Sequence, residues 1–521
     1  MIASIPSAVL LGVDGRPVSV EVHVSNGLPG LTMVGLPDAA VRESRDRVRA
    51  ALVSSGLAWP RRKITVNLAP SGMRKAGAGL DLPIAIGILV ASGVLAPEVV
   101  ARHAFVGELG LDGSIRGVPG MMALADALVG HRVIVADASL HEARLAGGSC
   151  SSAPSMTELV ARCTGRRPWS EPSAQSASPA FSNQASEGER DGVRSRETLG
   201  APDLADVAGQ PVARRALEAA AAGGHHLLLV GPPGAGKTLL ATRLAGLLPN
   251  LDALTAREVT RIHSAAGVLG GGGGLIVRPP VRAPHHGVSA VALIGGGSAA
   301  MRPGEIGLAH GGVLFLDELG EFPTAVLDAL RQPLEDGVVQ VSRARGTITF
   351  PARFLLVAAM NPCPCGDGGL PGACRCAPAA RSRYARRLSG PLLDRFDLVV
   401  RVERPSVEDL MARRKNESTH DVANRVLTAR ARAEERGVVV NAELPVATLD
   451  ATAPVDHGAR ELLERRLRSG QLSARGLHRV RRLARTLADL DGVGPVVSDT
   501  QVAEALFLRG SRALVLGEDV R

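Results

Sequence analysis

The chain has 521 residues, 45% hydrophobic and 21% charged, which is too long for one compact core and favours two or three soluble globular domains. Its net charge of +9 permits a polyanionic partner such as nucleic acid but does not require one. No secretory signal is visible, the longest apolar run contains proline and glycine, and six cysteines do not suggest a disulfide framework, so we expect a cytoplasmic protein without a membrane span.

Residues 1–165 alternate between strand-like and helix-like stretches. One amphipathic stretch follows Asp38, a residue type that commonly caps the start of a helix. Another stretch is apolar on all sides, as expected of a helix inside a core. The pattern predicts an α+β or α/β domain with strands over 18–24, 64–68 and 133–135 and helices over 39–57 and 83–92.

The composition changes after this first domain. Residues 166–202 are rich in Ser, Ala, Pro and charged side chains and cannot bury much apolar surface, which predicts a flexible linker. Residues 203–403 alternate apolar strands with helices around phosphate-binding signals, so we expect an α/β domain there. Residues 404–521 read as mostly helical, with Arg-rich amphipathic periods.

A phosphate-binding pattern lies between a predicted strand at 226–230 and a predicted helix at 239–248. It matches G-x-x-x-x-G-K-[ST], whose glycines let backbone N–H groups turn toward phosphates at a helix N-terminus. Lys237 is expected to pair with the β- and γ-phosphates of ATP, and Thr238 to bind Mg²⁺. The predicted phosphate-binding residues are Gly231, Pro232, Pro233, Gly234, Ala235, Gly236, Lys237 and Thr238.

Two further apolar strands end in polar side chains. Residues 313–316 read as a buried parallel strand followed by Asp317 and Glu318, which we expect beside the metal and beside the attacking water. A strand over 354–360 ends at Asn361. This side chain either orients the water or senses the γ-phosphate, or it only opens a turn before proline.

Four more segments complete the pattern: Arg-Ala-Pro-His-His at 282–286, Pro-Gly-Glu-Ile-Gly-Leu-Ala-His at 303–310, Asn-Pro-Cys-Pro-Cys-Gly at 361–366 and Ser-Gly-Pro-Leu-Leu-Asp-Arg-Phe-Asp at 389–397. With these segments the chain resembles the ComM/YifB-type magnesium-chelatase-like AAA+ ATPases and, more distantly, the MCM replicative helicases. The resemblance covers essentially the whole chain outside the linker. It implies a P-loop AAA+ core over 203–403 and a helical lid over 404–521.

The resemblance also implies roles for single residues. Asn361 becomes the sensor-one residue, and Arg395 an arginine finger that reaches the ATP site of a neighbouring subunit. An ion pair with Asp394 or Asp397 is the alternative for Arg395. A finger acting in trans requires a homo-oligomer, and the family implies a ring of six subunits.

Two weaker assignments follow from the same resemblance. Arg475 is the candidate sensor-two residue of the lid, and Arg479, four residues on along the same helix face, is the alternative. The adenine pocket is expected at Val207, Gly209 and Gln210.

Residues 1–165 resemble the family's N-terminal domain, which is similar in fold to the Lon protease domain and ribosomal protein S5. Segment 75–84 lies where Lon-type proteases carry a nucleophilic serine, but it contains none. Met122 or a neighbour stands where the catalytic lysine would lie. Because a Ser–Lys dyad needs both a nucleophile and a base, we expect a Lon-like fold without peptidase chemistry.

Four cysteines follow the third strand in the spacing C-x-C-x8-C-x-C. Four thiols so close in sequence are sufficient to bind one tetrahedral Zn²⁺, in a structural rather than a catalytic site. The spacing differs from the common C-x₂-C knuckle, so four reduced cysteines in a surface insert are the alternative. The candidate ligands are Cys363, Cys365, Cys374 and Cys376.

A β-hairpin is predicted over 338–350, with Arg343 and Arg345 at its tip. The corresponding hairpin of MCM-like rings points a basic side chain into the central pore, so the resemblance implies that both arginines track DNA phosphates. A glycine-rich insert at 267–297, which contains His285 and His286, is a second candidate pore loop.

Two functions remain open from sequence. The first is an ATP-driven ring motor, a DNA translocase or branch-migration helicase that acts on single-stranded or branched DNA in uptake or recombination. The second is a chelatase-like ATPase that remodels a protein partner. By the resemblance, the additional N-terminal domain counts against this second function. An ATP-dependent protease is disfavoured by the missing dyad.

Overall fold

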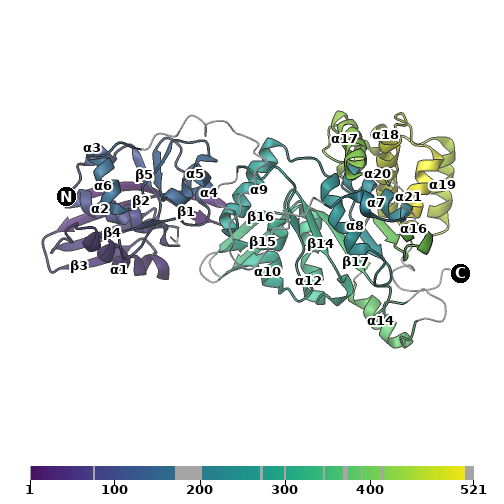
Figure 1. Cartoon of the computed structure of the whole chain (residues 1–521), viewed down its shortest axis with the longest axis horizontal. Helices are drawn as coiled ribbons and strands as arrows, with labels where there is room; N and C mark the ends of the chain where they lie inside the picture. Colours follow the sequence, from purple (N-terminus) through teal and green to yellow (C-terminus); the bar gives the residue numbers. More distant parts are fainter. Residues whose placement is uncertain are drawn as a thin grey trace.

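The computed structural model describes residues 2–73, 75, 77–169, 202–269, 274–297, 301–343, 346–367, 374–388, 390–411 and 416–510. The molecule is elongated, with an N-terminal lobe at one end, a central sheet domain, and a helical lobe at the other end (Figure 1). Most of the predicted linker lies outside the described residues.

The N-terminal lobe consists of two main sheets, a small two-stranded sheet of β6 (Glu108–Leu109) and β7 (Ile115–Arg116), and the helices around them. The larger sheet has the order β1 (Ile2–Leu11), β2 (Asp14–Ser25), β4 (Lys63–Ala69) and β3 (Gly30–Val34). The smaller sheet is parallel and has the order β5 (His103–Phe105), β8 (Arg132–Val135) and β9 (Cys150–Ser152). The helices of the N-terminal lobe include α1 (Ala39–Ser54), α2 (Asp81–Ala91), α4 (Met121–Asp126), α5 (Leu140–Arg144) and α6 (Met156–Cys163).

Helix α2 is the centre of this lobe. All of its residues are buried, because its apolar side chains point in every direction around the axis. It packs against β1 and β2, and the approach is close at Gly87, where a Cβ atom would lie 2.5 Å from Cγ2 of Val22. A larger residue at this position must therefore shift the Val22 side chain or the helix.

A five-stranded parallel sheet forms the core of the central domain. Its order is β11 (Val281–Arg282), β14 (Val313–Leu316), β17 (Leu355–Met360), β10 (Leu227–Val230) and β18 (Leu398–Arg401). The three middle strands are buried along their whole length, as expected when helices cover both faces of a sheet. The helices include α7 (Pro211–Gly223), α8 (Lys237–Leu244), α9 (Ala253–Ala266), α12 (Thr324–Ala329), α13 (Arg331–Asp336) and α14 (Pro378–Arg387).

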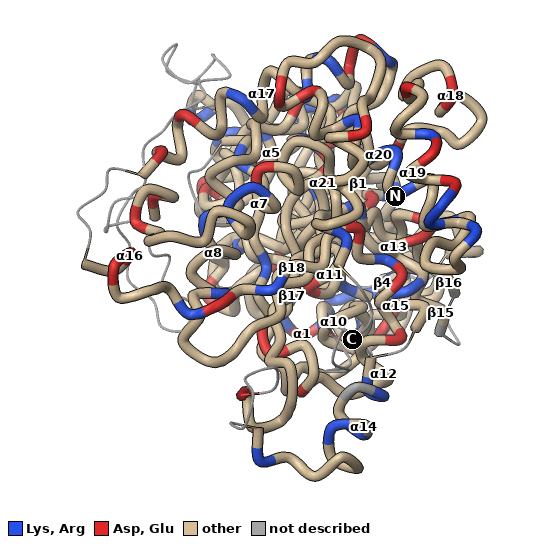
Figure 2. Tube along the Cα trace, turned by 90° about the vertical axis from the view of Figure 1, so that its right-hand side faces the viewer, with Lys and Arg blue, Asp and Glu red and all other residues tan. Residues whose placement is uncertain are grey.

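The helical lobe packs against α7. Its main helices are α17 (Thr419–Glu435), α19 (His457–Arg468), α20 (Ala474–Leu490) and α21 (Asp499–Leu508). Arg215 of α7 contacts Glu504 at 2.9 Å, and Arg425 of α17 contacts Glu218 of α7 at 2.6 Å. Basic and acidic residues are interspersed over these helices (Figure 2), so many lid arginines are neutralised locally.

The N-terminal lobe contacts the central domain through α4 and α9. The backbone N–H of Gly120 donates to the carbonyl of Ser264 at 2.9 Å, and the Ser264 hydroxyl donates to the carboxylate of Glu142. Arg257 of α9 lies 3.5 Å from Asp126 of α4. The N-terminal lobe and the central domain are therefore joined by both backbone and side-chain contacts.

Most of the predicted elements are confirmed. The strands at 18–24, 64–68 and 133–135 lie within β2, β4 and β8, and Asp38 caps α1 by accepting a hydrogen bond from the N–H of Val41. The helix predicted over 239–248 is shorter, because α8 gives way to a 3₁₀ turn over Ala245–Leu247. Strand β1 was not predicted, because its buried and exposed residues alternate only in part.

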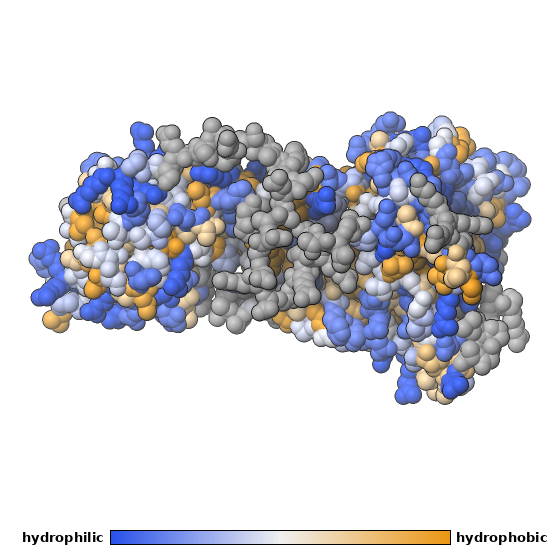
Figure 3. All heavy atoms as spheres, in the orientation of Figure 1, coloured by the Kyte–Doolittle hydropathy of each residue, from blue (hydrophilic) through white to orange (hydrophobic). Residues whose placement is uncertain are grey.

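Among the coloured atoms in Figure 3, hydrophilic residues predominate, with apolar residues in small patches between them. Among the described residues, no helix is both long and apolar enough to cross a bilayer.

Candidate nucleotide site

The predicted phosphate-binding turn connects the carboxyl end of β10 with the start of α8. Gly234 and Gly236 have φ values of 76° and 90°, a region that favours glycine, and Gly236 is the N-cap of α8. At Gly231 a Cβ atom would lie 2.1 Å from the carbonyl oxygen of Val402, so only glycine fits there. The turn therefore has the conformation in which backbone N–H groups bind an anion at a helix N-terminus.

Lys237 is folded into this turn. Its Nζ atom donates to the carbonyl oxygens of Gly231 at 2.7 Å and Pro232 at 3.0 Å, and to Oδ1 of Asn361 at 3.0 Å. Burial lowers the pKa of the Lys237 ammonium, while the charges of Asp317 and Glu318 oppose that shift. The amine thus lies where a phosphate would enter, held by neutral oxygens that a phosphate could replace.

The predicted metal ligands are in contact with each other. The Thr238 hydroxyl donates to Oδ2 of Asp317 at 2.7 Å, which brings the start of α8 to the end of β14. A hydroxyl and a carboxylate at this distance supply the hard oxygen donors that Mg²⁺ prefers. The two side chains therefore fit the predicted magnesium site.

Glu318 has a strained backbone. Its φ of 53° is left-handed, which costs a non-glycine residue about 1–2 kcal/mol. Its N–H donates to Oδ1 of Asp317 at 2.9 Å, and its side chain is exposed. Strain of this kind is retained where a side chain must point in one direction, here outward from the end of the sheet.

The predicted adenine segment lies beside the same turn. Gln210 donates from its amide to the carbonyl of Ala235 at 3.4 Å, and it has a φ of 59°. Val207 is buried, and its carbonyl accepts a hydrogen bond from Asn416 at 2.9 Å. Gly209, also left-handed, lies between them. The structure thus brings Gln210 to the phosphate-binding turn, with Gly209 next to it in the chain.

Arg395 lies at the opposite end of the strands, beside the amino ends of β10 and β18. It comes just before β18, and Asp397 and Leu398 donate from their N–H groups to the carbonyl of His226, which precedes β10. The phosphate-binding turn follows β10, four residues later, at about 3.3 Å per residue. The length of β10, about 13 Å, therefore separates Arg395 from the nucleotide turn. Arg395 does not contact the nucleotide turn of its own chain.

The partner of Arg395 is Glu335 of α13, with which it forms an ion pair. Asp397, one of the predicted alternatives, contacts Arg479 at 3.2 Å and His225 at 3.5 Å. Burial opposes the charge of Asp397, but the neighbouring His225 and the charge of Arg479 keep the pKa of this carboxyl well below its usual range. Arg395, Asp397 and Arg479 line one cleft of about 1020 Å³, and Lys237 is not part of its lining.

The remaining predicted residues are placed as follows. Arg475 is exposed in the first turn of α20, whereas Arg479 is tied to Asp397. The predicted hairpin exists as β15 (Val338–Arg343) and β16 (Gly346–Pro351). Arg343 ends β15, but its side chain and the whole of Arg345 lie outside the described residues.

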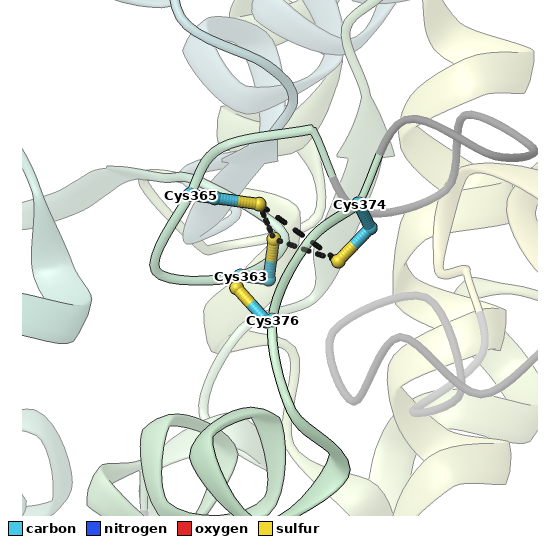
Figure 4. Close-up of side chains that lie close together, drawn as sticks. All are labelled: Cys363, Cys365, Cys374 and Cys376. Carbon is cyan, nitrogen blue, oxygen red and sulfur yellow. Dashed lines mark hydrogen bonds between the residues drawn. The ribbon is translucent and has the colours of Figure 1, made fainter.

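The four predicted metal-binding cysteines converge (Figure 4). Their sulfur atoms all lie within 4.8 Å of one another, with 3.2 Å from Cys363 to Cys365 and 3.7 Å from Cys363 to Cys374. Zn–S bonds of about 2.3 Å in a tetrahedron put the sulfurs about 3.8 Å apart. The thiols of Cys363, Cys365, Cys374 and Cys376 therefore fit one zinc ion with small adjustments.

The cysteine cluster also lies against the nucleotide turn. Gly366 packs so closely on the Pro233 ring that a Cβ atom would lie 2.5 Å from its Cδ. Arg404 donates to the carbonyl of Pro233 at 3.4 Å and lies 3.8 Å from Asp367. This contact was not predicted, because nothing in the spacing of 363–376 shows where the loop folds.

One more side chain reaches the site. Nδ1 of His286 lies 3.1 Å from Oε2 of Glu318. His286 was predicted to lie in a candidate pore loop, and the pair of histidines at 285–286 was the only sequence signal that could have indicated this contact.

Three family profiles match the chain. They are described as magnesium chelatase subunit ChlI over residues 203–410, subunit ChlI of Mg-chelatase over 20–138, and the ChlI C-terminal region over 416–509. The second match lies in the N-terminal lobe, so the presence of this lobe does not by itself separate the chain from proteins of that description.

Similar proteins align over nearly the whole chain. The uncharacterized protein YifB of Salmonella typhimurium is 41% identical over 99% of this chain and 98% of its own length. The competence protein ComM of Haemophilus influenzae is 42% identical over 99% of this chain and 98% of its own length. The magnesium-chelatase 38 kDa subunit of Rhodobacter capsulatus is 29% identical over 52% of this chain and 76% of its own length.

Proposed function

The chain belongs to the ComM/YifB-type magnesium-chelatase-like family, and from that premise we propose that it is an AAA+ ATPase. The observation that supports this most strongly is the convergence of Lys237, Thr238, Asp317 and Asn361 at the carboxyl end of a parallel sheet. Phosphate ligands bind in this position in open α/β sheets.

In the proposed reaction Lys237 leaves the carbonyl oxygens of the turn and binds the β- and γ-phosphates. Thr238 and Asp317 would hold Mg²⁺, which would neutralise charge on the phosphates. Glu318 accepts the proton of the attacking water, and Asn361, already beside Lys237, contacts the γ-phosphate. Gly231 to Thr238 supply the phosphate cradle, and Val207, Gly209 and Gln210 the adenine side.

We also propose that the active protein is a ring, with six subunits as the resemblance implies. The support is the position of Arg395, which is too far from its own nucleotide turn to act there. Arg395 then serves the ATP of a neighbouring subunit, and Arg479 or Arg475 of the lid contributes at the same boundary. Head-to-tail contacts of this kind close into a ring when the rotation between neighbouring subunits completes a full turn.

The proposed domains are a Lon-like/S5-like α+β domain over 1–165 without peptidase chemistry, a linker over 166–202, the AAA+ core over 203–403 and the lid over 404–521. Met122, at the predicted lysine position, is buried in α4, which is in keeping with a role in packing. We propose a cytoplasmic location for the whole chain.

For the substrate we propose DNA, as a translocase or branch-migration helicase in uptake or recombination. The support is the name of the competence relative, the net charge of +9 and the hairpin β15–β16 with its two arginines. Because many lid arginines are paired with acids, the hairpin is the better candidate for phosphate contacts.

Single-stranded and branched DNA are expected to stimulate the ATPase, and Arg343→Ala/Arg345→Ala is expected to remove that stimulation. Two lost phosphate contacts per chain lower the slope of log Kd against log salt by about 1.4 for single strands. The measurement is the ATPase rate with and without DNA, together with DNA binding at several salt concentrations.

Arg465→Ala/Arg466→Ala, which removes the same charge from the exposed surface of α19, is the control and should keep the stimulation. An ATPase that is indifferent to DNA in the wild type would favour the second function, the remodelling of a protein partner. That reading is supported by the similarity to the magnesium-chelatase subunit.

A structural zinc ion at the four cysteines is the last part of the proposal. Purified protein is expected to contain about one zinc per chain, and Cys365→Ser or Cys376→Ser to lose it, as measured by elemental analysis. Cys150→Ser is the control, because Cys150 lies in β9 and burial raises the pKa of its thiol to about 11. Zinc-free wild-type protein with four free thiols would leave the reduced-cysteine alternative.

A further inference from the structure

Helix α14 and the segment before it carry only positive charge. The sequence contains arginines but no Asp or Glu between positions 368 and 393. In Figure 2, α14 lies at the bottom of the molecule, with blue segments and no red ones within the helix. Such a segment attracts anions unless acids from other segments neutralise it. The arginines concerned are Arg375, Arg381, Arg383, Arg386 and Arg387.

One of these arginines is neutralised inside the chain. Arg387 donates to the carboxylate of Glu321 at 3.0 Å and to the carbonyl of Gly320 at 2.8 Å. Arg386 donates to the carbonyl of Ser382 in its own helix at 3.2 Å, which leaves its charge uncompensated. Within the part of the chain that the structure describes, no ion pair with a carboxylate is made by Arg375, Arg381, Arg383 or Arg386.

The opposite face of α14 is anchored in the core. Tyr384 and Leu388 are buried there. The helix packs on the 3₁₀ turn η6 (Leu319–Glu321), and a Cβ atom at Gly320 would overlap the Tyr384 ring. Before the helix, Cys376 belongs to the cysteine cluster. The basic face is therefore presented by an element that is held at both ends.

The exposed face of α14 suits phosphate better than it suits a protein. Arg383 and Arg386 are three residues apart, so they lie on the same face of the helix, and Arg375 is exposed just before it. The centre of a protein–protein interface is depleted in charge and rich in aromatic side chains. Here the aromatic side chain, Tyr384, is buried within the chain instead. Guanidinium groups bind phosphate oxygens through two parallel N–H donors.

The length of α14 also fits a nucleic-acid backbone. Its 10 residues span about 15 Å, over which one strand of B-DNA carries about four phosphates. The helix lies apart from the hairpin β15–β16 in both views (Figures 1 and 2). A contact at α14 would therefore be made by other nucleotides than those at the hairpin.

We propose that Arg375, Arg381, Arg383 and Arg386 form a second DNA-binding surface, the α14 surface, which holds the phosphate backbone of a strand away from the hairpin. This inference rests on the proposed DNA substrate and adds a separate contact to it. A branched DNA has more than one arm, so the hairpin and the α14 surface can each hold one.

The test is DNA binding by the full chain at several salt concentrations. Arg381→Ala/Arg383→Ala/Arg386→Ala is expected to lower the slope of log Kd against log salt by about 2.1 for single strands and about 2.7 for duplex arms. The matching triple lysine variant keeps the charges, so its slope should stay near that of the wild type.

Folding is checked on the same samples. Alanine favours helix, so the triple alanine variant is expected to keep the wild-type zinc content and Tm. If that variant does not fold, Arg383→Ala alone decides the question, with an expected fall in slope of about 0.7 for single strands.

Two further variants control the measurement. Arg460→Ala/Arg465→Ala/Arg466→Ala removes the same charge from exposed positions of α19 and should keep the wild-type slope. Adding Arg343→Ala/Arg345→Ala to the α14 variant should give the sum of the two separate losses, because sites that share no partners act independently.

A wild-type slope in the α14 variant would overturn the inference, and so would an equal loss in the α19 variant, since total charge would then explain the effect. The wild type separates the two levels of the proposal. DNA binding that depends on the hairpin but not on α14 contradicts only the α14 surface, whereas a wild type that binds neither single-stranded nor branched DNA contradicts the DNA substrate and the α14 surface with it.

Discussion

Lys237→Ala is expected to slow ATP hydrolysis strongly and to weaken ATP binding, because no other amine lies in the phosphate-binding turn among the described residues. The loss of such a transition-state contact lowers kcat by about 100-fold to 1000-fold. Glu318→Gln is expected to lower kcat by about 100-fold to 10,000-fold while ATP still binds, since the amide cannot take a proton from water. Phosphate release and binding of a fluorescent ATP analogue distinguish the two effects.

Lys63→Ala is the control for the first change, because Lys63 is exposed at the start of β4 in the N-terminal lobe. It should keep wild-type hydrolysis and binding. If Lys237→Ala hydrolysed ATP at the wild-type rate, the assignment of the nucleotide site would be wrong. If Glu318→Gln did so, another group would have to serve as the base.

Arg395→Ala is expected to lower kcat about 1000-fold or more, with ATP binding nearly unchanged. The reason is geometric: Arg395 lies at the amino ends of β10 and β18, and the nucleotide turn lies at the carboxyl end of β10. Its effect must therefore arise at a boundary between subunits. Hydrolysis and nucleotide affinity, measured on the assembled protein, test this expectation.

Mixing two inactive variants distinguishes action in trans from action in cis. A random mixture of Arg395→Ala and Lys237→Ala chains restores intact sites at about a quarter of the subunit boundaries, so activity should return. Glu335→Gln tests the structural alternative, because Glu335 is the partner of Arg395 within the chain. If Glu335→Gln lost as much activity as Arg395→Ala, and mixing restored none, the ion pair alone would explain the effect.

The nucleotide turn was predictable because its requirements are local. Gly234 and Gly236 are needed for left-handed backbone, and Lys237 and Thr238 follow at fixed positions in the first turn of α8. The buried strands were predictable for a similar reason: a parallel strand covered on both faces must be apolar along its length, as β14 and β17 are.

Other features depend on which strands become neighbours. The order β11-β14-β17-β10-β18 puts Asp317 and Asn361 beside Lys237, although the chain separates them by whole helices. The same order puts Arg395 at the amino end of β10. Its ion-pair partner there is Glu335, and not Asp394 or Asp397, the two predicted alternatives. Periodicity carries no information about such pairings.

By itself, the sequence determined the family, the strand–turn–helix of the phosphate site and the acids that follow β14, because each is specified by neighbouring residues. Only the tertiary structure decided that the cysteine loop packs on Pro233, that Arg479 pairs with Asp397, and that His286 lies against Glu318. These contacts join side chains from segments distant in sequence. Such contacts depend on how the whole chain packs, and packing is a property of the complete fold rather than of any single segment.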